Sequence, residues 1–431
     1  MRLLLCFYFN AKILFDFYRN NAIIKLALRM FLGLKSEYGL INQKRKEAAM
    51  ATILITGATG TVGSSLASSL ESKGHRLIYL IRPKNGQNNA ERLSEALGLG
   101  TIGSRVILEG DVTLDHLGVN GSERRRWRNK IDKIVNCAAS IKFEESLRRL
   151  TTQINIEGVR NLLGLAEELR ISEFHQISTA YVAGDADYFT EDDFDIGQKP
   201  RNVYEETKKE AERLVRNWRY GRYSIYRLGI VVGDSATGYI SSFNGYYGFL
   251  SSLWHLRREL ELKDRHDRKK YDANGISFDS DGMLILPICM NFSPISTLNI
   301  TPIDWVVRTV SDLVEFPTIG QVFHIVHPQP PKARWMNDVS LKELGIKGFY
   351  YGDSVVSSAQ AVSGRFQRIF NRSTAQYIPY ITHEAKFEVA NVPRVLGLRY
   401  ASPPNIDEAF VPKVLDYAKS VDFGKKKKVK V

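Results

Sequence analysis

From Ala51 onward, short apolar runs rich in β-branched residues alternate with segments that carry apolar residues at helical spacing. The runs that predict strands are ATILITG, RLIYLI, RVILEGDV, KIVNCAA, EFHQIS and YSIYRLGIVVG. Helices are predicted between them at residues 64–73, 122–131, 144–169 and 203–219. Such alternation favours a parallel sheet with helices on both faces. The expected fold class is therefore α/β, a doubly wound parallel sheet of the Rossmann type.

The regular alternation ends at Gly233. A helical segment near 243–262 follows, then a polar stretch, and then the strand-like runs MLILPICM and TLNITPI. A late strand and helix of this region are expected to return to the core of the first domain. We divide the chain into an N-terminal extension at 1–49, a Rossmann domain at 50–233, a smaller substrate-binding lobe at 234–423 and a basic tail at 424–431.

The net charge of +13 is concentrated at the two ends of the 431-residue chain. Residues 1–49 hold nine Lys or Arg against three Asp or Glu, and residues 425–430 add five lysines. The body between them is nearly neutral, so we expect no nucleic-acid partner. The three cysteines, Cys6, Cys137 and Cys289, are too few and too scattered for a disulfide framework or a metal site. We predict no metal, a cytoplasmic setting, and an apolar packing role for Cys137 rather than a nucleophilic one.

The first part of the chain, residues 1–34, is apolar, but charged residues interrupt it before any run reaches the ~20 residues of a membrane span. No transmembrane helix is predicted, and no small-residue cleavage site marks a secretory signal. One interpretation is a basic amphipathic anchor in peripheral contact with a membrane. We favour another, in which residues 1–49 are translated upstream DNA, because the codons of residues 46–48 can spell a ribosome-binding sequence. A protein that begins at Met50 is then expected to fold and to be active.

The string TGATGTVG directly follows the first predicted strand and opens the first predicted helix. Its three glycines allow a tight turn, a close approach of the backbone to a pyrophosphate, and close packing of the helix. Glycines at this spacing are a weak signal alone and a strong one between a strand and a helix. We therefore predict a bound dinucleotide, held by Gly57, Thr59, Gly60, Thr61, Val62 and Gly63.

The ends of the next three strands predict which dinucleotide is bound. Arg82 stands about nineteen residues after the glycine string, where an acidic residue would hold the ribose 2′-hydroxyl of NADH. An arginine there favours the 2′-phosphate of NADPH, and an exposed arginine at a strand end is the alternative. Asp111, with its neighbour Val112, is predicted to contact the adenine, although capping of a turn would explain Asp111 equally well. The small residues Ala138 and Ala139 let the cofactor lie against the backbone, and ordinary close packing would also explain them.

Tyr204 and Lys208 are four residues apart on a predicted helix and so share one face. A free tyrosine titrates near pH ~10, so its use as an acid near neutrality requires a nearby positive charge such as the lysine ammonium. The fifth strand ends in Ser178 and Thr179, and we favour the Thr179 hydroxyl as the group that binds the substrate oxygen. Asn155 either holds a water or backbone group below the lysine or lies on the surface.

With these residues in place, the chain resembles the extended short-chain dehydrogenase/reductase superfamily, and within it the thioester-reductase-like group of male sterility proteins and fatty acyl-CoA reductases. The resemblance covers residues 52–423 and rests on TGATGTVG, NCAAS, STAYV and YEETK, with VNCAASIKFEE, INIEGVRNLL, ISTAYVAGD and GIVVGDSATG for the narrower group. One departure is Arg227-Leu228, where the family usually has proline after the arginine. The resemblance implies catalytic roles for Thr179, Tyr204 and Lys208, and cofactor roles for the glycines, Arg82, Asp111, Ala138 and Lys208.

The expected function is NADPH-dependent hydride transfer to an acyl thioester, an acyl-CoA or acyl-carrier substrate, to give an aldehyde or an alcohol. No adenylation or carrier domain is recognised, so the activated acyl group is expected to arrive ready-made. The alternative enzyme acts on a keto or hydroxyl group of a lipid, steroid-like or nucleotide-sugar substrate. A nucleotide-sensing regulatory protein would lack the tyrosine and lysine that this chain keeps. Core packing or an acyl tunnel would explain the aromatic residues Phe143, Phe243, Tyr246, Tyr247, Phe249 and Trp254.

Overall fold

The structure is a computed structural model that describes residues 50–263, 271, 275–290, 293–316, 320–351 and 364–425. The chain divides into two units, residues 1–51 and residues 52–431, and every element named below belongs to the second unit. The expected N-terminal extension therefore lies outside the described residues, as does most of the basic tail. Within the described ranges, no helix is both long enough and apolar enough to cross a membrane.

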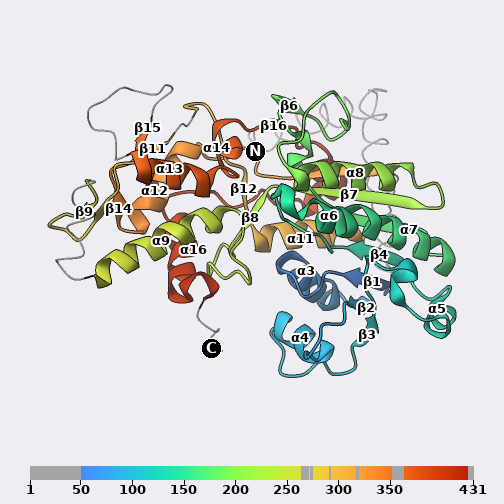
Figure 1. Ribbon diagram of the computed structural model, residues 1–431. Helices are drawn as coiled ribbons and strands as arrows, with labels where there is room; N and C mark the ends of the chain where they lie inside the picture. Colours follow the sequence, from blue (N-terminus) through green and yellow to red (C-terminus); the bar gives the residue numbers. More distant parts are fainter. Residues whose placement is uncertain are drawn as a thin grey trace, which may run out of the picture. The chain divides into compact units, whose positions relative to one another are not determined.

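Seven parallel strands form the central sheet, in the order β13-β7-β5-β4-β1-β2-β3 (Figure 1). Both faces of the sheet are covered, so the strands are rich in buried apolar residues, and Ile53, Leu54 and Ile55 are fully buried. The predicted Rossmann-type fold class is confirmed. The bounds are β1 (Thr52–Thr56), β2 (Arg76–Ile81), β3 (Val106–Glu109), β4 (Lys133–Asn136), β5 (Glu173–Thr179), β7 (Arg222–Leu228) and β13 (Gln321–Ile325).

Helices cover the two faces of the sheet (Figure 1). One layer is built by α3 (Thr61–Ser72), α11 (Ile303–Val314) and α15 (Asn391–Leu396), and α11 packs against both of the others. The other layer is built by α5 (Gly121–Trp127), α6 (Arg148–Thr152), α7 (Gly158–Leu169) and α8 (Val203–Asn217). Helix α4 (Asn89–Ala96) lies between β2 and β3 in the sequence.

Two late elements belong to the sheet region although they follow much of the rest of the chain. Strand β13 pairs with β7 from Gln321 opposite Ser224 to Ile325 opposite Leu228. Helix α11 packs on α3, where the Ser69 hydroxyl donates to Ser311 Oγ at 2.9 Å. The segment 303–325 thus completes the sheet and adds α11 to one of its helical layers.

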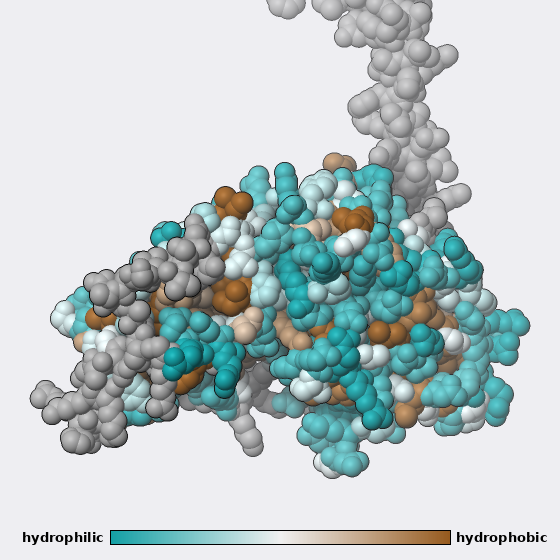
Figure 2. Space-filling model, turned by 45° about the horizontal axis from the view of Figure 1, so that its top comes forward, coloured by the Kyte–Doolittle hydropathy of each residue, from teal (hydrophilic) through white to brown (hydrophobic). Residues whose placement is uncertain are grey.

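The remaining elements form a second lobe with its own apolar core (Figure 1). Buried residues such as Leu250, Leu253, Met336, Val411 and Leu415 make up this core. In the view of Figure 2 the described surface is mostly hydrophilic, with small separate hydrophobic areas. The helices are α9 (Tyr246–Leu262), α12 (Ala333–Glu343), α13 (Gly364–Thr374), α14 (Ile378–Thr382) and α16 (Phe410–Ser420), and the strands are β9 (Ser277–Phe278), β10 (Leu284–Ile285), β11 (Cys289–Met290), β14 (Ile346–Lys347) and β15 (Tyr350–Tyr351).

Two short parallel ladders join the lobe to the sheet region. Strand β8 (Ile230–Val232) pairs with β12 (Ile300–Pro302), and β6 (Tyr188–Phe189) pairs with β16 (Lys386–Phe387). The run YSIYRLGIVVG, predicted as one strand, is therefore two strands. They separate at Gly229, where a Cβ atom would lie 2.8 Å from the Asn299 carbonyl oxygen.

The predicted helix at 144–169 is wrong as one regular α-helix. A 3₁₀ turn at Glu145–Leu147, α6, a π-helical turn at Gln153–Glu157 and α7 follow one another instead. The buried side chain of Asn155 lies in the π-helical turn. Its Oδ1 accepts from the Ser140 N–H at 2.7 Å, and its Nδ2 donates to the Ser140 carbonyl oxygen at 3.0 Å. A polar side chain that must reach inward accounts for a wider turn at this point.

Candidate active site

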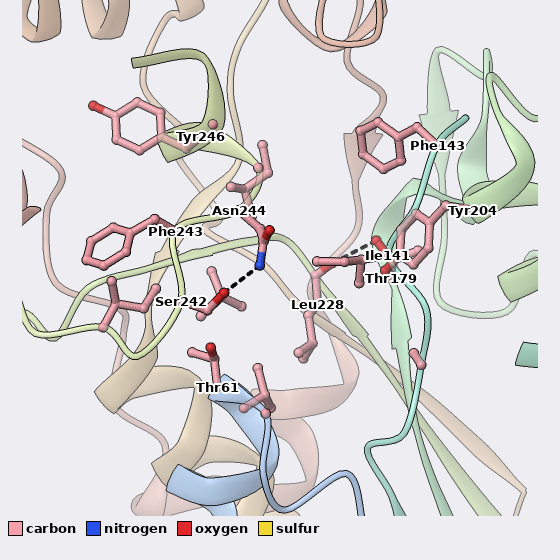
Figure 3. Close-up of a pocket in the computed structure, with 18 of the residues that line it drawn as sticks. Thr61, Ile141, Phe143, Thr179, Tyr204, Leu228, Ser242, Phe243, Asn244 and Tyr246 are labelled. Carbon is pink, nitrogen blue, oxygen red and sulfur yellow. Dashed lines mark hydrogen bonds between the residues drawn. The ribbon is translucent and has the colours of Figure 1, made fainter. Parts of the chain in front are cut away.

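A cavity of about 890 Å³ lies where the carboxyl ends of β1, β4, β5 and β7 meet the second lobe (Figure 3). In doubly wound sheets, ligands bind outside this edge. The cavity is lined by the glycine string, by the ends of the four strands and by α8, and on the far side by α9, α12 and the chain from 374 to 381. The predicted site residues on its lining are Gly57, Thr59, Gly60, Thr61, Val62, Gly63, Ala139, Thr179, Tyr204 and Lys208.

The glycine string forms a turn that no side chain can enter. Gly57 has φ +67°, and a Cβ atom on it would lie 2.6 Å from the Cys137 carbonyl carbon. A Cβ atom on Gly63 would lie 2.2 Å from the Gly57 carbonyl oxygen. Gly60 is the N-cap of α3 and offers no side-chain cap, so the first turn of that helix presents backbone N–H groups at the cavity wall. This arrangement fits the pyrophosphate of a dinucleotide.

Four predicted cofactor residues lie outside the cavity lining. Arg82 Nε is 3.9 Å from Asp111 Oδ2, and the Arg82 side chain is 57% exposed. The other Asp111 oxygen accepts hydrogen bonds from the backbone N and the hydroxyl of Thr113, so the turn-capping role of Asp111 is present. Val112 packs against Gly158, and the Ala138 N–H donates to Thr56 Oγ1 at 3.1 Å.

Arg92 lines the cavity and is not among the predicted site residues. It lies on α4, which the sequence pattern does not predict, although Asn88 is a good N-cap and accepts from two backbone N–H groups. The Arg92 guanidinium donates to the Arg82 carbonyl oxygen at 2.7 Å. Two guanidinium groups therefore come from the region that follows β2. The signal that could have found Arg92 is an arginine on a helix after that strand.

Thr179, Tyr204 and Lys208 come from two elements, the end of β5 and the first two turns of α8. Figure 3 shows Thr179 and Tyr204 side by side. Thr179 Oγ1 donates to the Leu228 carbonyl oxygen at 3.3 Å. Lys208 is buried, and its Nζ donates to the Ile177 carbonyl oxygen at 2.6 Å. The Tyr204 hydroxyl and the Thr179 hydroxyl interact at the same wall of the cavity. Two hydroxyls and one ammonium are thus available at one place.

Burial shifts both titrating groups toward their neutral forms. It raises the pKa of Tyr204 to about 12, and the hydrogen bond with Thr179 opposes the shift. It lowers the pKa of Lys208 to about 8, and the Glu212 carboxylate opposes that shift. Tyr204 keeps its proton at neutral pH and is a hydrogen-bond donor.

Three neighbouring residues also have definite roles. Ser178 also lines the cavity, but its hydroxyl donates to Glu212 Oε1 at 2.5 Å, so its proton is already engaged by that carboxylate. Asn155 is buried and its Nδ2 donates to Thr207 Oγ1 at 2.9 Å, so the surface alternative for Asn155 is wrong. Burial raises the pKa of the Cys137 thiol to about 12, which does not suit a nucleophile.

The aromatic residues divide between the cavity and the core. Phe143, Phe243, Tyr246 and Phe249 line the cavity. Phe143 lies 5.9 Å from Tyr204 between ring centroids, on the same side of the site (Figure 3). By contrast, the Tyr247 hydroxyl accepts from the Gly233 N–H and the Trp254 indole donates to Asp422, so these two rings are packing residues.

Comparison with known proteins gives a family match over residues 55–310, to an NAD-binding domain family described as the male sterility protein. The match covers more than half of the chain. The chain belongs to the male sterility protein family. A nicotinamide dinucleotide is therefore the cofactor of this family member.

Among individual relatives, fatty acyl-CoA reductase 1 of Xenopus laevis is 32% identical over 30% of this chain and 28% of its own length. This chain thus spans little more than a quarter of that relative. The terminal R domain of the myxalamid PKS-NRPS biosynthetic pathway has a TM-score of 0.67 at 23% identity, covering 88% of this chain and 93% of that one. DesIV of Streptomyces venezuelae, a dTDP-glucose 4,6-dehydratase solved with NAD, has a TM-score of 0.56 at 16% identity, covering 86% and 97%. At these identities the solved structures show a shared fold.

The departure at Arg227-Leu228 leaves the site of this male sterility family member intact. The Arg227 side chain is fully buried and pairs with Glu212 at 2.9 Å. Leu228 lines the cavity and provides the carbonyl oxygen that accepts from Thr179. The backbone at residue 228, rather than its side chain, thus orients the Thr179 hydroxyl.

Proposed function

We propose that this protein is an NADPH-dependent reductase of acyl thioesters, with an acyl-CoA or acyl-carrier substrate. The observation that carries the proposal is one continuous cavity that joins the dinucleotide turn, the hydroxyls of Thr179 and Tyr204, and an apolar far side. Membership of the male sterility protein family and the partial likeness to fatty acyl-CoA reductase 1 support an acyl substrate.

The cofactor is proposed to lie along the glycine string, with its pyrophosphate at the N-terminus of α3 and its 2′-phosphate near Arg82 and Arg92. Bound NADPH would supply the hydride that reduces the carbonyl carbon. Arginine forms charge-assisted hydrogen bonds with phosphate, and the Arg82 guanidinium is largely exposed, 3.9 Å from Asp111. Lys208 is proposed to hold the ribose as well as the Tyr204 hydroxyl.

The protein side of the reaction is hydrogen-bond donation to one oxygen. Tyr204 donates to the thioester carbonyl oxygen and transfers its proton as negative charge develops there, and Thr179 donates to the same oxygen after its hydroxyl proton turns away from the Leu228 carbonyl. The product of this step is a hemithioacetal. Its C–S bond then breaks, the thiol leaves with a proton, and the aldehyde forms.

The second lobe is proposed to bind the acyl chain. Phe249, Leu250, Met290 and Met336 line its side of the cavity, and all belong to or pack against its apolar core. Burial of methylene groups in such a site contributes ~0.8 kcal/mol each. The proposed substrate-binding lobe is residues 234–423, apart from the segment that completes the sheet.

Thiol release measured against NADPH consumption tests this function. With a long-chain acyl-CoA, we expect thiol to appear in step with NADPH loss. One thiol per NADPH identifies the aldehyde as the product, and one per two identifies the alcohol. Oxidation of NADPH by ketones, with no thiol released from any acyl-CoA or acyl-carrier substrate, would instead assign the protein to the keto or hydroxyl oxidoreductases.

Cofactor preference is expected to depend on Arg82. NADPH should bind more tightly than NADH, and Arg82→Ala should remove most of the difference, because a charge-assisted contact is worth ~1.5 to 3 kcal/mol. Dissociation constants from nucleotide fluorescence measure this for the parent and the variant. Arg126→Ala, at an arginine that is 61% exposed on α5, is the matched control and should leave the preference unchanged. Equal affinities of the parent protein for both nucleotides would refute the assignment.

A further inference from the structure

A buried carboxylate, Glu212, lies one helical turn after Lys208 on α8 and is not part of the cavity lining. Its side chain has no exposed surface. One oxygen accepts from the Ser178 hydroxyl at 2.5 Å, and the other accepts from Arg227 Nη2 at 2.9 Å. Glu212 therefore contacts the ends of two neighbouring strands from a single position on the helix.

Along β5, the residue that contacts Glu212 lies between two residues whose contacts involve the proposed catalytic residues. On β5, the Ile177 carbonyl accepts from Lys208, the next residue donates to Glu212, and Thr179 donates to the Leu228 carbonyl. Three consecutive residues of one strand end are thus each tied to a neighbouring element. On β7, Arg227 and Leu228 are consecutive in the same way.

We propose that Glu212 is a positioning residue, which fixes the ends of β5 and β7 against the face of α8 that carries Tyr204 and Lys208. The inference rests on the proposed function for its kinetic consequence, but its geometric basis is independent of the substrate. A displacement of about 1 Å at a reacting group can cost ~100-fold in rate. A fully buried ion pair with fixed hydrogen bonds restrains such a displacement.

Further polar contacts surround this pair. Arg227 also donates to the carbonyl oxygens of Thr190 and Asp193, and it lies 3.3 Å from His324 Nε2. Burial lowers the pKa of His324 to about 3, so that ring is neutral. Arg216, on the same helix, lies 4.0 Å from the Glu212 carboxylate.

Glu212 also acts on the electrostatics of Lys208. The groups that face the Lys208 ammonium are the Glu212 carboxylate on its own helix, the neutral Cys137 thiol at the end of β4 and the Ile177 carbonyl on β5. Glu212 raises the pKa of Lys208 against the effect of burial. Loss of the Glu212 charge should therefore move the titration of Lys208 to lower pH.

Two variants and one control test the proposal. Glu212→Gln keeps the shape and removes the charge, Ser178→Ala removes the bond to β5 and leaves the ion pair, and Glu210→Gln removes a 40% exposed carboxylate from the same helix. NADPH affinity is measured from pH 6 to 10 by fluorescence, which requires no acyl substrate. Turnover is measured with whichever substrate the parent reduces, thioester or ketone.

We expect the alkaline midpoint of NADPH affinity to fall by ~1 pH unit in Glu212→Gln and to stay in place in Ser178→Ala and Glu210→Gln. Turnover should fall by ~10- to 100-fold in Ser178→Ala and stay unchanged in Glu210→Gln. If Glu212→Gln does not fold, because Arg227 is left buried without its partner, Ser178→Ala decides the question. Folded Ser178→Ala with parental turnover would overturn the proposal. A parent protein that reduces only ketones would refute the thioester function. The role of Glu212 would then be tested by the same measurements, with the ketone as substrate.

Discussion

Replacement of Tyr204 by phenylalanine is expected to lower turnover by ~100- to 10,000-fold while NADPH affinity stays nearly unchanged. The ring still lines the cavity beside Phe143, but the proton donor next to Thr179 is lost. Because burial raises the pKa of Tyr204 to about 12, the parent hydroxyl holds its proton throughout the neutral range. The measurements are steady-state turnover with a long-chain acyl-CoA and NADPH binding by fluorescence.

Tyr220→Phe is the control for this substitution. Tyr220 is 46% exposed and does not line the cavity, so loss of its hydroxyl should leave turnover unchanged. A Tyr204→Phe protein with a turnover within threefold of the parent would show that another group supplies the proton. A folded variant that no longer binds NADPH would place Tyr204 in cofactor binding rather than in catalysis.

Replacement of Lys208 by alanine is expected to impair two properties together. Turnover should fall by ~100-fold or more, because the ammonium that lines the same cavity as Tyr204 is lost, and NADPH affinity should fall by ~10-fold through loss of the proposed ribose contact. The same pair of measurements, turnover and fluorescence binding, checks both effects. If turnover is lost and NADPH affinity is unchanged, Lys208 does not bind the ribose.

The pH dependence of the parent protein follows from the same lysine. Burial lowers the pKa of Lys208 to about 8, so the ammonium is present below that pH and is lost as pH rises through it. Turnover should therefore be sustained toward neutral pH and decline on the alkaline side of about 8. In Lys208→Arg the charge persists at every accessible pH, so the alkaline decline should disappear even if the rate is lower. A parent profile that is flat to pH 10 would contradict the assignment.

Six of the seven sheet strands could be located from the sequence because each lies in a short run rich in apolar residues, whereas β13 is expected only as an unspecified late strand. Both faces of a parallel sheet are buried, so a strand such as RLIYLI is apolar at nearly every position and can be recognised from its own residues alone. The π-helical turn at 153–157 could not be predicted, because it depends on a contact between Asn155 and Ser140 across a loop. The division of the last long run into β7 and β8 also depends on a distant partner, β12.

In the candidate site, too, local sequence patterns predict some residues, and others depend on distant partners. Tyr204 and Lys208 share a helix face, and Thr179 ends a strand, so local pattern places all three at the carboxyl edge of the sheet. Arg92 and Glu212 are less visible in the sequence, since their importance comes from partners on other elements. The cavity wall formed by the second lobe comes from segments far apart in the chain, and no periodicity in one segment reveals which of its aromatic rings face a cavity.

Synthesis on a ribosome delivers β7 long before β13, although the two strands pair along their length. Until α11 has left the exit tunnel, α3 lacks its helical partner, and until Gln321–Ile325 has followed, β7 has an unpaired edge. Open strand edges and apolar helix faces recruit other chains. Folding during translation is therefore held back until well past the dinucleotide turn, and a chain stalled before residue 320 should be a preferred client of chaperones that bind exposed strand edges.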